Sequence, residues 1–356
     1  MSKAYLVLSN GDVFEGTAIG ASHDSIGELV FTTGVVGYPE TLTDPCYAGQ
    51  IVMQTFPLIG NYGIIEEDLS LKPALSGYVV SEICSTPSNF RCDYPLEKYL
   101  EDNGICGICG VDTRQITRII REQGVMNAMI CSEVPSDLTS VKEYKIENAV
   151  AAVSSSEVEN YPCDGEAKYN VALIDYGDKK DFIKCLNERG CNVVSYPYDT
   201  PAQDILAADP DGILLSNGPG DPADNKFCIE QISKLMGKKP IFGISLGHQL
   251  AALAMGGKTY KLGYGHRGAN QPVTDLSGNR TYISVQNHGY AVQPDSLVGV
   301  ARQTFINAND GTCAGLEYTM LKCFTVQFIP EACSDGRDSE GLFSKFIDMM
   351  GGEKDA

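Results

Sequence analysis

The segment Lys239–Met255 constrains this chain most, because it combines a strand, a tight turn and a helix. Pro240–Ile244 is typical of a short buried strand, and Leu250–Met255 is typical of a helix. Between them, residues 243–247 form a G-x-S-x-G turn, which is typical of an elbow that holds a nucleophile above a parallel sheet. The glycines permit close backbone approach, and the following helix N-terminus favours developing negative charge. Ser245 therefore stands where a nucleophile belongs.

From residue 168 onward, strand-like and helix-like segments alternate. Strands are predicted at Tyr169–Asp175, Asn192–Tyr196 and Asp211–Ser216, and helices at Asp181–Arg189 and Phe227–Met236. This alternation with short connections predicts an α/β fold with a doubly wound, mostly parallel sheet. Such sheets bind ligands at the carboxyl ends of their strands, where the elbow and the loop after the third strand both fall.

The first part of the chain has a different pattern. Residues 1–145 mix short strand-like runs, such as Ala4–Leu8, with turn signals, which predicts a separate, mixed β/α domain. A helix is predicted at Thr113–Gln123, because three isoleucines share one of its faces. Residues 146–167 are small, serine-rich and acidic and are predicted to be a linker, so that residues 168–356 form the second domain.

Composition excludes several classes of function. A length of 356 residues predicts two domains. The net charge of −19 argues against a nucleic-acid partner or an anionic membrane surface, since both need basic surface. No apolar run reaches the roughly 18 residues of a membrane span.

The 13 cysteines have no framework spacing, which favours a reducing cytoplasm. The pair Cys106 and Cys109 has the spacing of a metal site but lacks the second pair that such a site needs.

Motifs in both parts of the chain resemble one family. Segments 216–222 and 243–249 resemble the oxyanion loop and nucleophile turn of class I, triad-type glutamine amidotransferases. Segments 265–272 and 286–292 narrow this to the small, glutaminase subunit of carbamoyl phosphate synthetase. The N-terminal domain of that subunit is similar to this chain over segments 33–45, 56–61 and 111–114. The resemblance therefore implies that subunit's N-terminal domain followed by a class I glutamine amidotransferase domain.

The family hydrolyses the side-chain amide of glutamine with a Cys–His–Glu triad. The resemblance implies that the ammonia passes to a large subunit, which makes carbamoyl phosphate for pyrimidine and arginine biosynthesis. No cofactor is expected in this chain. It has no Walker A loop, and ATP, Mg²⁺ and bicarbonate are expected in the partner. The chemistry needs a thiolate, an imidazole that activates it, and a carboxylate that orients the imidazole.

The chain departs from the family triad at two of its three positions. The nucleophile position is Ser245 rather than cysteine, and the position of the family histidine is Ile329. Glu331 retains the carboxylate but has no imidazole to orient. The chain holds only four histidines, three of which match family positions outside the triad. Because an alkyl side chain cannot accept a proton, we expect glutaminase activity to be impaired or lost.

The predicted glutamine pocket is better retained than the triad. By resemblance, two glycines lie in the substrate loop, one residue supplies an oxyanion N–H, and the others contact the glutamine. These predicted positions are Cys46, Lys179, Gly218, Gly220, Leu246, Gln249, Asn287, Gly289 and Tyr290. Cys46 stands where the family usually has serine, and a thiol is the poorer hydrogen-bond partner. The chain is thus expected to bind glutamine even where it does not cleave it.

Three functions remain open from the sequence. The first is the small subunit of a glutamine-dependent carbamoyl phosphate synthetase, a ligase, in a heterodimer with its large subunit. The second is a non-catalytic, glutamine-binding or regulatory paralog in an ammonia-dependent complex. The third is a serine hydrolase that uses Ser245 with His288 as its base.

One further feature has two interpretations. Arg114, Arg118 and Arg121 share the basic face of the predicted helix Thr113–Gln123. Such a face is usually solvated, and docking of the large subunit is the alternative. The sequence alone does not decide between the two.

Overall fold

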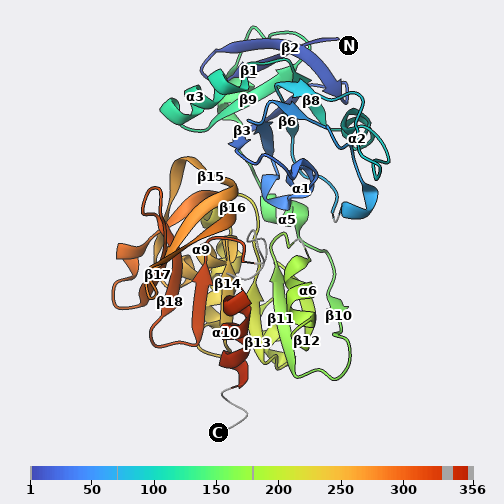
Figure 1. Ribbon diagram of the computed structural model, residues 1–356. Coiled ribbons are helices and arrows are strands. Elements are labelled where there is room, and N and C mark those ends of the chain that lie inside the picture. The colour runs from blue at the N-terminus through green and yellow to red at the C-terminus, as the bar shows by residue number, and fades with distance from the viewer. Residues whose placement is uncertain (1, 70, 179, 331–339, 352–356) are drawn as a thin grey trace. The chain divides into compact units, whose positions relative to one another are not determined.

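The computed structural model describes residues 2–69, 71–178, 180–330 and 340–351, and these divide into two compact units (Figure 1). Unit 1 comprises residues 1–149 together with Gly263–Arg267, and unit 2 comprises the rest of the chain. In the described part of the chain, no helix is long and apolar enough to cross a membrane.

Unit 1 is built on a closed barrel of mixed strand direction, drawn in blue to green in Figure 1. Around the barrel, β3, β4, β6 and β8 pair in parallel, whereas β1, β2 and β9 pair antiparallel to their neighbours. In barrel order, the strands are β1 (Lys3–Leu8), β2 (Val13–Gly20), β8 (Cys106–Cys109), β6 (Gly77–Val79), β4 (Gln50–Gln54), β3 (Ser25–Thr32) and β9 (Met126–Cys131). The expected mixed β/α domain is therefore confirmed.

Helices cover the barrel: α1 (Tyr38–Thr43), α2 (Leu96–Asp102), α3 (Thr113–Gln123) and α4 (Thr139–Glu143). The predicted bounds of α3 are confirmed. Ile116 and Ile120 of α3 are fully buried in the core, next to the buried Leu8 of β1. Asp112 caps the helix by accepting a hydrogen bond from the Gln115 N–H at 2.8 Å. The apolar stripe and the N-cap together explain why this segment folds as a helix.

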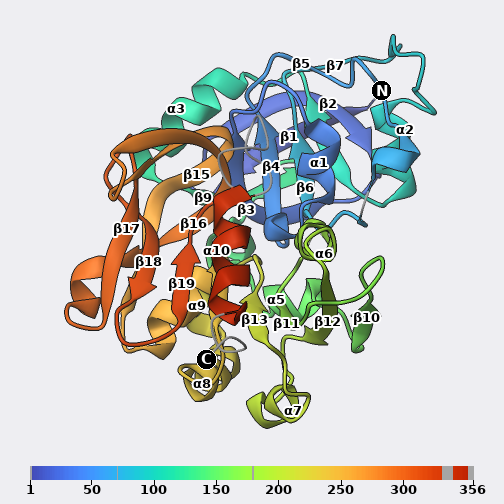
Figure 2. The same cartoon turned by 60° about the horizontal axis from the view of Figure 1, so that its bottom comes forward.

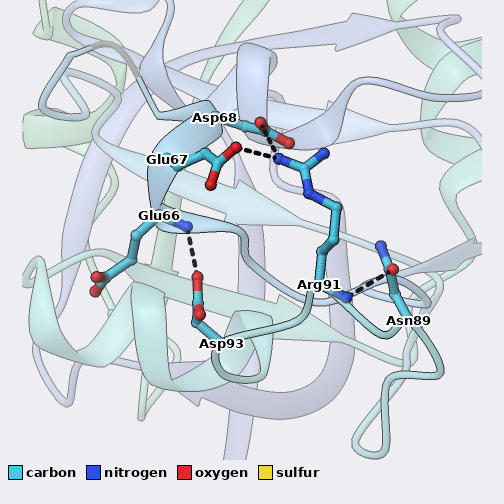
Figure 3. Close-up of polar contacts among 6 residues, drawn as sticks. All are labelled: Glu66, Glu67, Asp68, Asn89, Arg91 and Asp93. Carbon is cyan, nitrogen blue, oxygen red and sulfur yellow. Dashed lines mark hydrogen bonds and ion pairs between the residues drawn. The ribbon is translucent and has the colours of Figure 1, made fainter.

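A polar cluster links two loops beside the small sheet of β5 (Leu58–Ile59) and β7 (Glu82–Ile83). Arg91 bridges Glu67 at 2.9 Å and Asp68 at 2.8 Å, and the Asp93 carboxylate accepts from the Glu66 N–H at 2.9 Å (Figure 3). Because these side chains are exposed, the ion pairs contribute little stability and mainly fix the loop geometry.

The described residues of unit 2 form a ten-stranded sheet. Five strands run parallel at its centre: β12 (Cys191–Pro197), β11 (Tyr169–Asp175), β13 (Gly212–Leu215), β14 (Ile241–Ile244) and β19 (Cys323–Val326). β10 (Glu159–Tyr161) adds to one edge, and beyond β19 lie β18 (Cys313–Tyr318), β17 (Ala301–Asn307), β15 (Lys258–Asp275) and β16 (Arg280–Gln293). The expected parallel sheet is confirmed, whereas its antiparallel extension past β19 was not predicted.

Helices pack on both faces of the parallel strands, as a doubly wound sheet requires. One face carries α6 (Asp181–Asn187) and α10 (Glu340–Gly351), which lies in front of the sheet in Figure 2. The other face carries α5 (Ala149–Val153), α7 (Ala202–Ala207), α8 (Lys226–Leu235) and α9 (Leu246–Ala254). Short 3₁₀ turns connect other elements at Pro45–Tyr47, Glu66–Asp68, Pro222–Asp224 and Pro294–Leu297.

Burial alternates along the central strands between these two layers. Val171 and Leu173 of β11 join the core of α6 and α10, whereas Ala172 and Ile174 join the core of α8 and α9. A near-continuous apolar run is what a strand covered on both faces needs.

Two local predictions differ in detail from the structure. Residues 146–167, which the sequence suggests as a linker, hold α5 and β10. Helix α9 begins at Leu246, directly after the elbow, rather than at the predicted Leu250. Gly247 in this first turn does not prevent the helix, since tertiary contacts outweigh its low intrinsic propensity.

Candidate functional site

Ser245 is the residue between β14 and α9, and its backbone has the strained conformation of a nucleophile elbow. Its φ is 53° and its ψ is −106°, a region that side-chain-bearing residues rarely adopt. Its N–H donates to the Val326 carbonyl at 2.8 Å, which fixes the turn to the end of β19. The side chain is 1% exposed. The elbow predicted from the sequence is therefore present.

The glycines on either side of Ser245 are required by close packing. A Cβ on Gly247 would lie 2.4 Å from the Leu215 carbonyl oxygen, and one on Gly243 would lie 2.8 Å from Cγ2 of Thr325. The Gly247 N–H donates to the Ser216 carbonyl at 3.0 Å. The elbow is thus held against the end of β13 as well as that of β19.

The loop that begins at Ser216 is fixed by a short polar network. The Ser216 hydroxyl accepts from the Tyr176 N–H and donates to the Asn217 carbonyl, both at 2.8 Å. The Asn217 amide donates to the Gly177 carbonyl at 3.0 Å. A Cβ on Gly218 would lie 2.4 Å from the Tyr176 carbonyl, so only glycine fits there. The predicted oxyanion loop is therefore rigid and closely packed.

Two predicted glutamine-binding positions lie in these turns, Leu246 after the elbow and Gly220 in the loop that begins at Ser216. Leu246 is the first residue of α9, so its N–H has no acceptor within the helix, and its role as an oxyanion donor stays a prediction. Gly220 has a φ of 86°, which suits glycine. Lys179 lies outside the described residues.

Gln249 connects α9 to two other parts of the site. Its side-chain amide donates to the Tyr290 carbonyl at 2.7 Å and to Oε1 of Gln327 at 2.9 Å. Gln249 is 3% exposed. The structure thereby brings together Gln249 and the end of β16, which carries the predicted positions Asn287, Gly289 and Tyr290.

His288 is engaged at both ring nitrogens. Its Nδ1 lies 2.8 Å from the Tyr290 carbonyl oxygen, and its Nε2 lies 2.9 Å from Oε1 of Gln286. A general base needs a free lone pair aimed at the hydroxyl that it deprotonates. Since both nitrogens face other oxygens, this arrangement does not favour His288 as the base for Ser245.

Ile329 occupies an apolar position. Its side chain is 6% exposed and packs in the cluster that contains Phe324, Val326 and Phe328. Its N–H donates to the Val285 carbonyl at 2.9 Å, so its backbone is fixed by a bridge to β16. The position predicted for the triad histidine therefore presents hydrocarbon. Glu331 lies outside the described residues.

His248 is the other histidine of unit 2, and it serves the core. Its Nδ1 lies 2.8 Å from the hydroxyl of Thr325, and the residue has no solvent exposure. Burial lowers the pKa of His248 to about 3, so it stays neutral. His23 and His266 belong to unit 1. Among the described residues of unit 2, no imidazole forms a hydrogen bond with the Ser245 hydroxyl.

Sequence reasoning missed one residue that organises the site. The Asp175 carboxylate accepts from the N–H groups of Gly177 and Asp178, both at 2.8 Å, and from that of Ser155 at 2.7 Å. It thereby shapes the turn on which the loop of Ser216 rests. An aspartate at the last residue of a buried strand can accept hydrogen bonds from the N–H groups of the turn that follows, and this pattern in the sequence could have indicated its role.

Two other predictions concern residues outside this network. Cys46 lies in unit 1, where its N–H donates to the Asp44 carboxylate at 2.9 Å, so its part in glutamine binding stays a prediction. No group of three or more His, Cys, Asp or Glu residues in the described ranges is arranged to hold a metal ion.

Comparison with known families matches both parts of the chain. Residues 6–130 match the family described as carbamoyl-phosphate synthase small chain, CPSase domain. Residues 172–349 match the family described as glutamine amidotransferase class-I.

Curated relatives match over nearly the full length. The carbamoyl phosphate synthase small chain of Clostridium perfringens is 48% identical over 352 residues, which cover 97% of this chain and 99% of that protein. The protein of the same name from Listeria monocytogenes serotype 4b is 45% identical, covering 100% of this chain and 99% of its own. That of Syntrophotalea carbinolica is 45% identical and covers 98% of each chain.

Proposed function

This chain belongs to the family of carbamoyl phosphate synthase small chains, and from that membership we propose that it is a small subunit whose own site binds glutamine but does not hydrolyse it at a normal rate. The partner is then a large synthetase subunit that draws on free ammonia. ATP, Mg²⁺ and bicarbonate belong to that partner, and the cytoplasm is the proposed location. Pyrimidine and arginine biosynthesis are the proposed pathways.

The observation that carries this proposal is the environment of Ile329. The family resemblance requires an imidazole at this position to accept the nucleophile's proton and to protonate the leaving ammonia. The side chain present is an alkyl group packed among apolar residues, with its backbone fixed to Val285. A hydrocarbon can do neither task, so the site lacks its acid–base group.

The serine at position 245 makes this deficit more severe. A serine hydroxyl is a far weaker acid than a thiol, so it depends on a base more strongly than cysteine does. Neither described histidine of unit 2 forms a hydrogen bond with Ser245: His248 contacts Thr325 through Nδ1 alone, and His288 contacts Tyr290 and Gln286. Loss of triad members commonly lowers turnover by about 10³- to 10⁶-fold.

The retained pocket supports binding without turnover. The loop of Gly218, the N–H of Leu246 and the contacts of Gln249 do not depend on the triad, because they are built from backbone and amide groups. These groups match the polar amide of glutamine, which both donates and accepts hydrogen bonds. A glutamine-binding, regulatory role in the complex is compatible with the same arrangement.

Calorimetry with L-glutamine tests this binding directly. The purified chain is expected to bind glutamine at millimolar concentration without releasing ammonia. The variant Gly218→Val is expected not to bind, because even a Cβ would lie 2.4 Å from the Tyr176 carbonyl. Absence of heat from the unaltered chain at millimolar glutamine would contradict the proposal.

A fluorophosphonate probe tests the serine hydrolase alternative. Such probes label an activated serine, so the proposal expects no labelling at Ser245. Labelling that disappears in Ser245→Ala would show that a base activates this hydroxyl.

A further inference from the structure

A hollow of about 530 Å³ lies on unit 1 beside helix α3. Its lining includes Arg114, Arg118 and Arg121 together with five hydroxyl side chains, among them Thr33, Ser81 and Thr113. Such a lining donates hydrogen bonds and carries positive charge, which is the chemistry that receives carboxylate or phosphate oxygens.

The three arginines lie on one face of α3, at spacings of four and three residues. All three are exposed, while Ile116 and Ile120 on the opposite face are buried. Arg121 lies over the ring of Tyr264, with 5.8 Å between the guanidinium carbon and the ring centroid. This ring contact positions one arginine at the end of the row.

No acid neutralises the first two of these arginines within the described ranges. Arg114 and Arg118 form no ion pair there, whereas Arg91 and Arg302 each pair with a carboxylate. Asp112 also lines the hollow, but its carboxylate caps α3 by accepting from a backbone N–H. Unpaired guanidinium groups gathered on one helix of a chain with a net charge of −19 indicate an acidic occupant.

The surroundings favour a protein segment over a small anion. A second open hollow of about 480 Å³ lies along the same helix, and Arg114 and Arg118 line both. The loop that follows Thr33 exposes Val35 and Val36, which are 63% and 78% accessible. Exposed apolar side chains next to arginines are typical of protein interfaces, whereas a small-anion site is enclosed.

We infer that this arginine face, defined by Arg114, Arg118 and Arg121, docks a carboxylate-bearing segment of the large subunit. The inference rests on the proposed function for the identity of the partner, but it concerns assembly rather than glutamine chemistry. The guanidinium groups bind the partner's carboxylates, and the exposed valines provide adjacent apolar contact.

The test measures assembly of the full chain with the large subunit from the same genome. The variant carries Arg114→Glu and Arg118→Glu, and the matched control carries Lys72→Glu and Lys145→Glu. The control makes the same change in charge at two exposed lysines of unit 1 that line neither hollow. Dissociation constants are measured by biolayer interferometry at several salt concentrations, and circular dichroism checks that each variant folds.

The arginine variant is expected to raise the dissociation constant by at least about tenfold and to flatten its salt dependence, while the control changes it less than about twofold. Equal weakening by variant and control would overturn the inference, as would unchanged binding by the arginine variant. Failure of the unaltered chain to bind the large subunit would instead overturn the proposed function.

A competition arm separates the protein occupant from a small anion. Inorganic phosphate and ATP are titrated against the isolated chain, and against the arginine variant, by calorimetry. Binding that requires Arg114 and Arg118 and does not compete with the large subunit would overturn the docking inference in favour of a small-anion site.

Discussion

The backbone N–H of Ser245 donates to the carbonyl oxygen of Val326 at 2.8 Å. This bond continues the parallel pairing of β14 with β19, in which Ile244 lies opposite Val326. The nucleophile position therefore directly follows one strand, and Ile329 lies three residues beyond the end of its neighbour. Both positions stand at the carboxyl edge of the sheet, where doubly wound folds bind ligands.

This relationship predicts that two substitutions are needed to restore glutamine hydrolysis. Ser245→Cys alone is expected to remain inactive, because no base is present at position 329. Ser245→Cys with Ile329→His is expected to release ammonia at least about 10²-fold faster than either single variant. The measurement is ammonia release from L-glutamine in the complex with the large subunit.

The matched control for this pair is Ser245→Cys with Ile329→Gln. It introduces a polar side chain of similar size without a proton acceptor, so it should stay inactive. Recovery by Ser245→Cys alone would show that another group serves as base.

The strained backbone at Ser245 predicts that glycine is better tolerated there than alanine. With φ at 53° and ψ at −106°, a Cβ is strained, whereas glycine adopts such angles readily. Ser245→Gly is therefore expected to have a free energy of unfolding about 1 kcal/mol above that of Ser245→Ala. Urea denaturation of both variants measures the difference, and equal midpoints would count against strain at the elbow.

Gly247 is predicted to be irreplaceable although it lies in a helix. Alanine there gains about 0.5–1 kcal/mol of helix propensity, but its Cβ would lie 2.4 Å from the Leu215 carbonyl. Because overpacking costs about 1–3 kcal/mol and the neighbour is backbone, the contact outweighs the propensity. Gly247→Ala is expected to lower the free energy of unfolding by at least about 1 kcal/mol net.

Gly263→Ala is the control for this prediction. A Cβ there has no heavy atom within 4 Å, so its effect should stay within about 0.5 kcal/mol. Similar losses in the two variants would mean that the close approach at Gly247 does not decide its stability.

Burial of His248 predicts a loss of stability in mild acid. Its pKa falls from 6.5 to about 3 on folding, so below pH 6.5 the unfolded chain binds a proton that the folded chain does not. The free energy of unfolding then falls with decreasing pH, by about 2 kcal/mol between pH 7 and pH 5 from this group alone. His248→Gln is expected to flatten that dependence in urea denaturation.

His23 serves as a control, because its pKa shifts in the opposite direction from that of His248 on folding. Hydrogen bonds to the Asp24 and Gly104 carbonyls raise its pKa, so its contribution is present in acid and lost as the pH rises through its folded pKa. His23→Gln should therefore leave the acid loss in place. An NMR titration of the imidazole of His248 that shifts near pH 6.5 would contradict its neutral burial.

The sequence predicted much of unit 2, because its local patterns agree with its tertiary fold. The run Tyr169–Asp175 is apolar on both faces, and β11 has these bounds. The G-x-S-x-G turn predicted the elbow, since few other turns place glycine on both sides of a central residue. Signals of this kind are local, so they can be recognised in a single sequence.

What the sequence did not predict depends on contacts between distant residues. The bond from His248 to Thr325 and the bond from Gln249 to Gln327 join segments more than 70 positions apart. The antiparallel strands β15 and β17 have half-buried, irregular patterns, and strand pairing of this kind is fixed by neighbours rather than by local propensity. The engagement of both nitrogens of His288 could likewise be seen only in the fold.

Product formation by the complex with the large subunit tests the central claim most directly. Carbamoyl phosphate synthesis is measured with L-glutamine and with ammonium chloride as alternative nitrogen sources, alongside ammonia release from glutamine. The account predicts synthesis from ammonium and neither synthesis nor ammonia release from glutamine above the rate of Ser245→Ala. Glutamine-dependent synthesis that is lost in Ser245→Ala would contradict it, because Ser245 would then act with a base other than residue 329.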